Sequence, residues 1–401
     1  MGQFVKGIPD PENSPNEKFE FPALPHNIRE QILADMRGER IDHDLAQRLA
    51  NVLQKNHERY YWQEQRLREH LEWWANIHTH PGGAGQDPAA SWDLLVDAYV
   101  TPGSNTYRMS PIYTPEGEFF DSLSLGDSSG GNQGYSAKWS PDNQYLAYGF
   151  SADSGSQFRM YDRSYNVLSG SGVPTSNAVR GVAWSLDSSL YALADSQGRC
   201  RLLELDEFNQ VTLLDTGAGT AYEPAFSPDG NKLAVGASTG VFVYNISDLN
   251  NISLEWSFTS GVSHAYRVDW HPSGEHLAAG SSSSGLLLLT NTGSRITDHD
   301  ETPDTVQSVR WSPDGSILAI GHNSPGKLEY MNEDFELLEG VPAVPDDPSN
   351  VNDLQWLPDS SIVGIAHSEG TTFITRDKSI LHEVSQTEDK VRRSVAVKIK
   401  E

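Results

Sequence analysis

The stretch Ser308-Val-Arg-Trp311-Ser-Pro-Asp-Gly315-Ser-Ile-Leu-Ala-Ile-Gly321 decides the fold. An apolar run ends in Trp311, a Ser-Pro-Asp-Gly turn follows, and a second apolar run ends in Gly321. Proline presets φ for the turn, aspartate bonds to its own backbone, and glycine readily adopts positive φ. The stretch therefore predicts a hairpin of two antiparallel strands.

This hairpin recurs five more times along the chain, each time with an aromatic residue just before the turn. The six aromatic anchors are Trp139, Trp184, Phe226, Trp270, Trp311 and Trp356. Their spacings are 45, 42, 44, 41 and 45 residues, which is the period of one four-stranded propeller blade. The repeat predicts a mainly β protein built from propeller blades.

The turns that follow the anchors carry a family resemblance. Ser227-Pro-Asp-Gly230 and Ser312-Pro-Asp-Gly315 resemble the repeats of WD-repeat propellers and of TolB-type propellers, in which Trp or Phe precedes Ser-Pro-Asp-Gly. The resemblance covers residues 91–400 and implies a β-propeller. The chain departs from the WD family in lacking regular Gly-His and Trp-Asp dipeptides, so the buried hydrogen-bond set of that family does not carry over.

The two ends of the repeat region predict how the ring closes. Leu94–Val100, Tyr107–Tyr113 and Glu118–Leu123 look like three strands of a blade that has no anchor strand of its own, whereas Arg393–Ile399 is one strand too many. Joining them gives a seventh blade and removes an open sheet edge. We therefore expect seven four-stranded antiparallel blades, closed by a carboxyl-terminal strand, with segments such as Glu336–Leu338 as fourth strands.

The first 90 residues have a different composition from the repeats. Residues 1–25 form a proline-rich arm that cannot hold a helix. Residues 26–80 are predicted to be a helical docking segment with a long amphipathic helix over Asp42–Ile77, residues 81–90 a linker, and residues 91–401 the propeller. The predicted partner-binding residues on the helix are Tyr60, Tyr61, Trp62, Leu67, Leu71, Trp73 and Trp74. The alternative is that these side chains pack on the protein's own propeller or on a shorter amphipathic helix predicted over residues 27–37.

The composition bounds the environment of the protein. The net charge of −26 argues against binding to nucleic acid, because phosphate recognition needs clustered Lys and Arg. A dispersed acidic surface with ten Lys and nineteen Arg suggests a halophilic source, and the alternative is an ordinary acidic protein. With neither a secretory signal nor an apolar run long enough for a membrane span, we expect a soluble protein. The single Cys200 rules out an intramolecular disulfide and a Cys-based zinc site.

Side chains alternate between the two faces of a strand, so the residues one and three positions before each anchor point away from the anchor's buried face. These positions on the innermost strands are candidate sites for chemistry at the axis. Their charged members are Lys138, Glu223, Arg267, Asp269, Arg310 and Asp353. Three cations among three anions favour ion pairs between blades over a metal site, because divalent metals want converging oxygen ligands without competing cations.

Other candidate motifs are weaker than this set. Ser238, in a Gly-x-Ser-x-Gly pattern, falls in a turn between strands, and the His78/His80 pair lacks a third ligand. The acidic stretches 298–301 and 346–347 lack calcium-loop spacing. The sequence predicts no catalytic, cofactor-binding or metal-binding residues.

These features together predict a non-enzymatic structural or interaction protein. The main hypothesis is a virion structural component of a halophilic, archaeal virus, docked through residues 1–80 into a larger and symmetric assembly of protein partners. The alternative is a cytosolic, cytoplasmic propeller scaffold for protein-protein interaction. A third hypothesis is a metal-dependent propeller hydrolase or lactonase. The step from propeller to function is an analogy of fold.

Overall fold

The structure is a computed structural model of the chain. It describes residues 92–100, 109–114, 119–124, 133–151, 157–168, 177–206, 208–297, 304–345, 348–385 and 391–399. All of them belong to the compact unit that spans Arg66–Glu401. The predicted arm, helical segment and linker lie outside the described residues. Within these ranges every named element is a β-strand, and none of them contains a helix long and apolar enough to cross a membrane.

The strands form seven antiparallel sheets, numbered here as blades 1 to 7. Blade 1 contains β26 (Val391–Ile399), β1 (Trp92–Val100), β2 (Met109–Tyr113) and β3 (Phe119–Ser124). Blade 2 contains β4 (Gln133–Trp139), β5 (Tyr145–Ser151) and β6 (Phe158–Asp162). Blade 3 contains β7 (Val179–Trp184), β8 (Leu190–Asp195), β9 (Arg199–Glu204) and β10 (Gln210–Asp215). Blade 4 contains β11 (Ala221–Phe226), β12 (Lys232–Ala237), β13 (Gly240–Asn245) and β14 (Ser253–Phe258).

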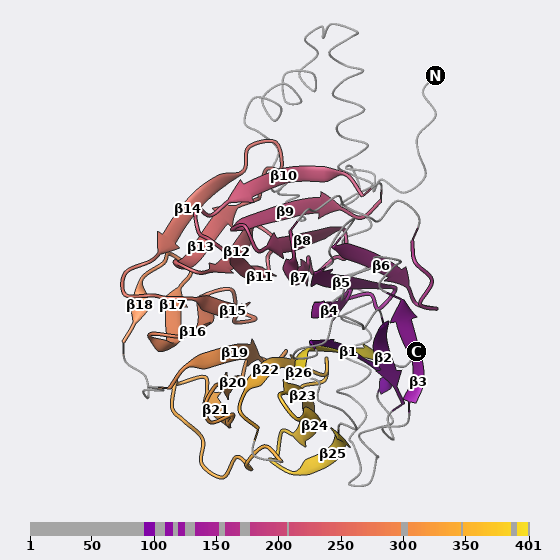
Figure 1. The fold of residues 1–401 in the computed structure, drawn as a ribbon. Helices are drawn as coiled ribbons and strands as arrows, with labels where there is room; N and C mark the ends of the chain where they lie inside the picture. The colour runs from indigo at the N-terminus through magenta and orange to yellow at the C-terminus, as the bar shows by residue number, and fades with distance from the viewer. Residues whose placement is uncertain are drawn as a thin grey trace, which may run out of the picture. The chain divides into compact units, whose positions relative to one another are not determined.

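The remaining three blades complete the ring. Blade 5 contains β15 (Ala265–Trp270), β16 (His276–Ser281), β17 (Gly285–Thr290) and β18 (Arg295–Ile296). Blade 6 contains β19 (Val306–Trp311), β20 (Ile317–His322) and β21 (Leu328–Asn332). Blade 7 contains β22 (Val351–Trp356), β23 (Ile362–His367), β24 (Gly370–Thr375) and β25 (Ile380–Ser385). Figure 1 shows the blades arranged around a central axis, with β4, β7, β11, β15, β19, β22 and β26 innermost.

The predicted closure of the ring is confirmed. β26 pairs antiparallel with β1, from Trp92 opposite Ile399 to Val100 opposite Val391, and the sheet order is β26-β1-β2-β3. Figure 1 shows the yellow β26 beside the indigo β1, although some 300 residues separate them in the sequence. The innermost position of blade 1 is therefore filled from the other end of the repeat region.

Two blades have three strands rather than the predicted four. In blade 6 the expected strand Glu336–Leu338 is reduced to a single bridge between Met331 and Leu337, and in blade 2 a similar bridge joins Tyr161 and Val167. In blade 6 the chain then runs through Pro342 and Pro345, which cannot donate to a strand ladder. The prediction of seven blades stands, and the fourth strand is the variable part of the repeat.

The hairpin turn is held by its own side chains. The Ser312 hydroxyl donates to Asp314 Oδ1 at 2.6 Å, and the backbone N–H of Ser316 donates to the same oxygen at 3.1 Å. Gly315 has φ of 76°, in the region that glycine accepts without strain, and its N–H donates to the carbonyl of Ser312. The Ser-Pro-Asp-Gly sequence therefore specifies the reversal locally, as predicted.

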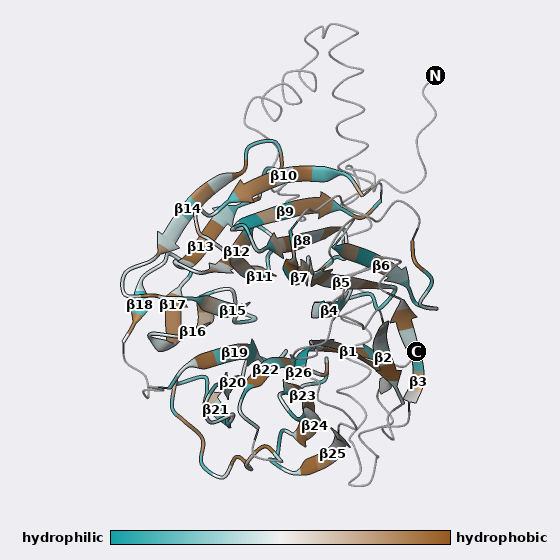
Figure 2. Ribbon diagram, in the orientation of Figure 1, coloured by the Kyte–Doolittle hydropathy of each residue, from teal (hydrophilic) through white to brown (hydrophobic). Residues whose placement is uncertain are grey.

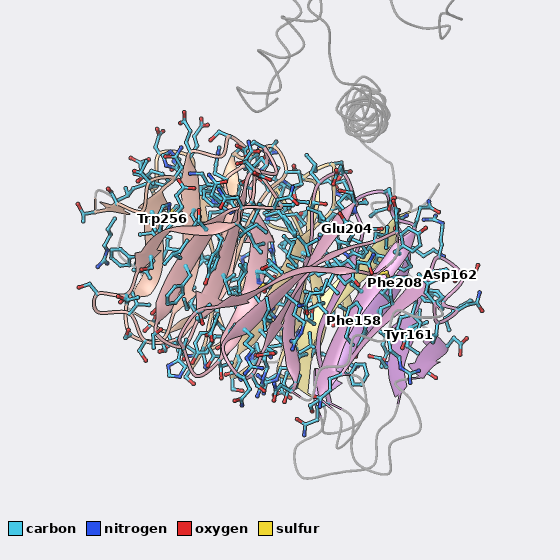
Figure 3. All side chains as sticks on the ribbon, turned by 90° about the horizontal axis from the view of Figure 1, so that it is seen from above. Phe158, Tyr161, Asp162, Glu204, Phe208 and Trp256 are labelled. Atoms are coloured by element: carbon cyan, nitrogen blue, oxygen red, sulfur yellow. The ribbon has the colours of Figure 1, made fainter. Side chains whose placement is uncertain are left out.

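The hydrophobic core is divided among the boundaries between blades. The described residues form seven buried hydrophobic clusters, and each cluster draws on two neighbouring blades. Between blades 2 and 3, Phe158 stacks on Tyr191 with ring centroids 5.6 Å apart, and Phe208 packs against the same cluster. Figure 3 views the ring from its side, with Phe158 and Phe208 labelled, and Figure 2 shows long hydrophobic stretches in strands such as β17. Each blade is thus stabilised by its neighbours.

Candidate functional site

The six predicted anchors end the innermost strands of blades 2 to 7, and three of them donate a hydrogen bond to the backbone of the blade before. The indole Nε1 of Trp184 donates to the carbonyl of Lys138 at 3.0 Å. Trp270 and Trp356 donate in the same way, to the residue just before the preceding anchor. These three bonds link the innermost strands of blades 2 and 3, of blades 4 and 5, and of blades 6 and 7 next to the axis of the ring.

The charged residues one and three positions before the anchors meet at this axis. We call this set the channel network: Lys138, Glu223, Arg267, Asp269, Arg310 and Asp353. They come from five different blades, and each of the six forms at least one ion pair with another member. The prediction of ion pairs between blades is confirmed.

Asp353 on β22 lies close to all three cations of the channel network. Its Oδ2 accepts from Lys138 Nζ at 2.8 Å and from the Ser394 hydroxyl at 2.6 Å. Its Oδ1 lies 3.5 Å from Arg310 Nη2 and 3.8 Å from Arg267 Nε. Because Ser394 lies on the closing strand β26, this one carboxylate connects blade 7 to blades 1, 2, 5 and 6.

The second half of the channel network surrounds Arg310. Its Nη2 donates to Glu223 Oε1 at 2.8 Å, and its Nη1 donates to Asp269 Oδ1 at 3.4 Å. Glu223 also accepts from Arg267. Asp269 Oδ2 accepts the backbone N–H of Trp311 at 2.7 Å, which fixes the anchor of blade 6. Arg267 therefore lies close to two carboxylates and Arg310 to three, each from a different blade.

Burial and neighbouring opposite charges shift the pKa values of the channel network in opposite directions. Burial alone would raise the pKa of Asp353 and of Glu223, yet the surrounding Arg267, Arg310 and Lys138 hold the pKa of both carboxyls below the usual range. Burial raises the pKa of Asp269 and lowers that of Lys138, although the opposite charges nearby reduce both effects. The channel network is thus a buried structural cluster whose charges depend on one another.

This arrangement bears on the hypothesis of a channel-bound metal. Among the described residues no group of three or more His, Cys, Asp or Glu side chains is placed to hold a metal ion. The carboxylates at the axis already accept from cationic side chains at hydrogen-bond distance. A divalent cation at Glu223 or Asp353 would have to displace a guanidinium or an ammonium group. The channel network therefore lends no support to the hydrolase hypothesis.

A second ring of side chains lies one layer further along the axis. We call it the mouth ring; it has one member from each blade, four positions before the anchor or its equivalent: Tyr135, Arg180, Tyr222, Tyr266, Gln307, Asn352 and Arg393. Together with Arg267 these residues line a cavity of about 120 Å³. Three tyrosines, two arginines and two amides converge there from all seven blades.

The mouth ring could not be predicted from strand alternation, because a β-bulge occurs at this point in every blade. In blade 2, Gly134 is opposite Phe150 and Ser136 opposite Gly149, so Tyr135 is an extra residue. The same register shift spans the mouth-ring residue in blades 3 to 7 and in the pairing of β26 with β1. Strict alternation would place these residues on the anchor's buried face, whereas a bulge re-aims the side chain. One signal in the sequence could have revealed the mouth ring: polar and aromatic residues occur at a position where alternation predicts apolar residues.

Aromatic contacts organise one side of the mouth ring. The rings of Tyr222 and Tyr266 meet edge to face with centroids 5.2 Å apart, and His264 lies against both. Burial, with a smaller contribution from Tyr266, raises the pKa of Tyr222. Between blades 2 and 3 the guanidinium of Arg180 lies 4.1 Å above the centre of the Tyr135 ring, a cation-π contact. The tyrosines are therefore held in place by neighbouring rings and charges.

The other sequence candidates fall into two groups. The predicted docking residues Tyr60 to Trp74, the His78/His80 pair and the acidic stretches 298–301 and 346–347 lie outside the described residues. Ser238 lies in the turn between β12 and β13, as predicted, where its Oγ accepts from the backbone N–H of Gly219 at 3.0 Å. Cys200 is a buried free thiol, and burial raises its pKa.

Fold and site together define a class: a seven-bladed β-propeller with an ion-paired axis and a basic, tyrosine-rich mouth. No family model matches the chain. A chain in the "Crystal Structure of Mitotic Checkpoint Complex" superposes with a TM-score of 0.55 over 78% of this chain and 87% of that chain, at 16% identity. This likeness is one of fold, and it confirms the predicted resemblance to seven-bladed WD-repeat-like propellers at that level.

A sequence relative covers a smaller part of the chain. The human "U3 small nucleolar RNA-associated protein 4 homolog" is 32% identical over 107 residues, which are 26% of this chain. The match spans only 15% of the length of that protein. Neither description points to a virus, so the comparisons give the virion hypothesis no support.

Proposed function

We propose that this protein is a non-enzymatic interaction scaffold whose propeller binds a segment of a partner protein at the mouth ring. The observation that carries the proposal is the convergence of one polar or aromatic side chain from every blade on one cavity. Tyrosine and arginine are enriched at the energetic centres of protein interfaces, where they combine apolar area with hydrogen-bonding groups. A propeller scaffold is the alternative hypothesis drawn from the sequence, and we prefer it to the hypothesis of a virion component.

Two further observations support a protein partner. The structural neighbour comes from the structure of a complex, and the sequence relative is named as a protein associated with a small nucleolar RNA. The net charge of −26 disfavours direct binding of an RNA backbone to this chain. The ion-paired axis makes the blades a rigid support, and a rigid support reduces the ordering cost of binding.

Site-specific crosslinking tests this proposal. A photo-reactive phenylalanine analogue in place of Tyr266 should capture partner proteins in extracts of the source cells. The control is the same analogue at Asp334, an exposed residue in the turn after β21. This turn lies at the end of blade 6 that is remote from the mouth ring. Capture should disappear when Tyr222→Ala is added. Equal capture from both positions would contradict the proposal.

We propose in addition that residues 1–80 anchor the scaffold in its assembly through the helix predicted from the sequence to carry Tyr60, Trp62 and Trp74. The amphipathic pattern and the aromatic content of this segment support the proposal. Deletion of residues 1–80 should leave the thermal unfolding of the propeller unchanged while the protein no longer co-purifies with its assembly. If the shortened chain still co-purifies, the anchor lies in the propeller; its recovery from purified virions would restore the virion hypothesis.

A further inference from the structure

We propose that Arg180 and Arg393 form an anion subsite within the mouth ring, which takes a carboxylate or phosphate group on the bound protein segment. This inference rests on the proposed function and specifies the chemistry of the partner.

The charges along the axis do not balance at the mouth. The channel network contains three cations and three anions, which are paired with one another. The mouth ring adds Arg180 and Arg393 and contributes no carboxylate. Two positive charges are therefore left over in the layer that lines the cavity.

The two guanidiniums lack anionic partners among the described residues. The Nε atoms of Arg180 and of Arg393 are buried and find no hydrogen-bond acceptor there. Arg180 contacts the face of Tyr135 instead, and in the described part of the chain Arg393 is hydrogen-bonded through its backbone carbonyl, which accepts from Arg267 at 3.0 Å. A buried donor without an acceptor costs free energy, which a bound anion would recover.

The surroundings of Arg393 are unfavourable for a cation. Burial lowers the pKa of Arg393, and the nearby positive charges of Arg180 and Arg267 lower it further, although Tyr135 acts in the opposite direction. An arginine remains charged in proteins, so the repulsion is retained in the folded state. An anion between the two guanidiniums would reverse the sign of this interaction.

The cavity limits what can enter. A volume of about 120 Å³ is somewhat smaller than an engineered cavity of about 150 Å³ that admits benzene, so it accommodates the end of one side chain rather than a whole peptide. The amide of Asn352 donates from Nδ2 to the carbonyl of Arg392 at 2.6 Å, while its Oδ1 is buried and has no donor among the described residues. Tyr222 and Tyr266 provide apolar walls.

Binding of defined peptide pools to the full chain tests the subsite. The probes are fluorescent nine-residue pools, random except for a central phosphoserine, Glu or Gln, measured by fluorescence anisotropy. We expect the phosphoserine and Glu pools to bind at least tenfold more tightly than the Gln pool. Arg180→Gln and Arg393→Gln should each reduce this preference to about twofold. Arg295→Gln, which removes the same charge from an exposed position on β18, should leave it unchanged.

Further variants and probes distinguish a failure of the subsite from a failure of the proposed function. Arg393→Lys retains the charge and should restore most of the preference, which guards against loss of binding through misfolding. Equal binding of the Glu and Gln pools would overturn the subsite; if Tyr266→Ala then still weakened both, the proposed function would survive. Saturable inorganic phosphate binding that depends on Arg393, without peptide binding, would assign the subsite to a free anion and contradict the proposed function. A preference for single-stranded RNA over the peptide pools would overturn both.

Discussion

The indole Nε1 of Trp356 donates a hydrogen bond of 3.1 Å to the carbonyl oxygen of Arg310, one blade earlier and 46 residues back along the chain. Arg310 is a member of the channel network, so the anchor of blade 7 holds the backbone of a residue whose side chain lies at the axis. The repeated aromatic residue and the ion-paired axis are therefore directly connected.

This connection predicts different costs for two otherwise similar substitutions. Trp356→Phe removes the indole N–H and leaves the Arg310 carbonyl without this donor, whereas Trp311→Phe removes an Nε1 that has no acceptor among the described residues. Both tryptophans are nearly completely buried, at 2% and 4% exposure. Trp356→Phe should lower the free energy of unfolding by about 0.5–1.5 kcal/mol more than Trp311→Phe, measured by urea denaturation. Equal costs would show that the bond contributes nothing.

The second prediction concerns the hub of the channel network. Asp353→Ala removes one of the three anions of the channel network. The cations Lys138, Arg267 and Arg310, which are largely buried, then outnumber the anions that remain. Removal of one partner from a buried ion cluster costs about 3–5 kcal/mol, and we expect that loss in the free energy of unfolding. Asp304→Ala, which breaks a half-exposed pair with Lys327, should cost less than about 1 kcal/mol. Similar losses in the two variants would contradict a structural role for the channel network.

The third prediction follows from the pKa of a turn aspartate. Burial would raise the pKa of Asp314, but hydrogen bonds from Ser312, Ser316 and Arg376 lower it to about 2. The unfolded value is about 3.9, so the stabilisation is complete above pH 4 and is lost as pH falls toward 2. Asp314→Asn should therefore reduce the drop in urea midpoint between pH 5 and pH 2.5. The exposed Asp334→Asn serves as the control and should leave the drop as in the unsubstituted protein.

The fourth prediction concerns the spacing of neighbouring blades. A Cβ at Gly280 on β16 would lie 2.8 Å from the carbonyl oxygen of Val306 and 2.9 Å from its Cγ1, both on the innermost strand of the next blade. Gly280→Ala should therefore destabilise the protein by about 1–3 kcal/mol. At Gly219 the nearest atom to such a Cβ is Ser238 Oγ at 3.7 Å, so Gly219→Ala should change stability by less than about 0.5 kcal/mol. Thermal unfolding of the two variants side by side distinguishes them.

Most of the fold could be predicted because it is repeated. Each hairpin is specified by residues close in sequence, and six copies at a constant spacing determine the blade period. The closing strand could be predicted because the number of strands is one too few at the start of the repeat region and one too many at its end. The reduced fourth strand of blade 6 could not be predicted, because Glu336–Leu338 has strand-like composition and the prolines that end its pairing come after it.

The site was only half predictable, for a geometric reason. Strand alternation correctly turned positions such as Asp269 and Asp353 toward the axis. It failed one step further along, at Tyr266 and Asn352, because a bulge adds one residue and reverses the alternation. The position of a bulge depends on the pairing partner, which a single strand does not reveal.

The closing strand has a consequence for when the candidate site exists at all. Arg393 and Ser394 lie on β26, which joins a blade whose other strands are formed from residues 92–124. Until β26 is seated, Asp353 lacks one of its donors and the mouth ring lacks one of its seven members. A partner that binds at the mouth therefore binds only the closed ring, and by mass action it opposes opening at the joint between the two ends of the repeat region.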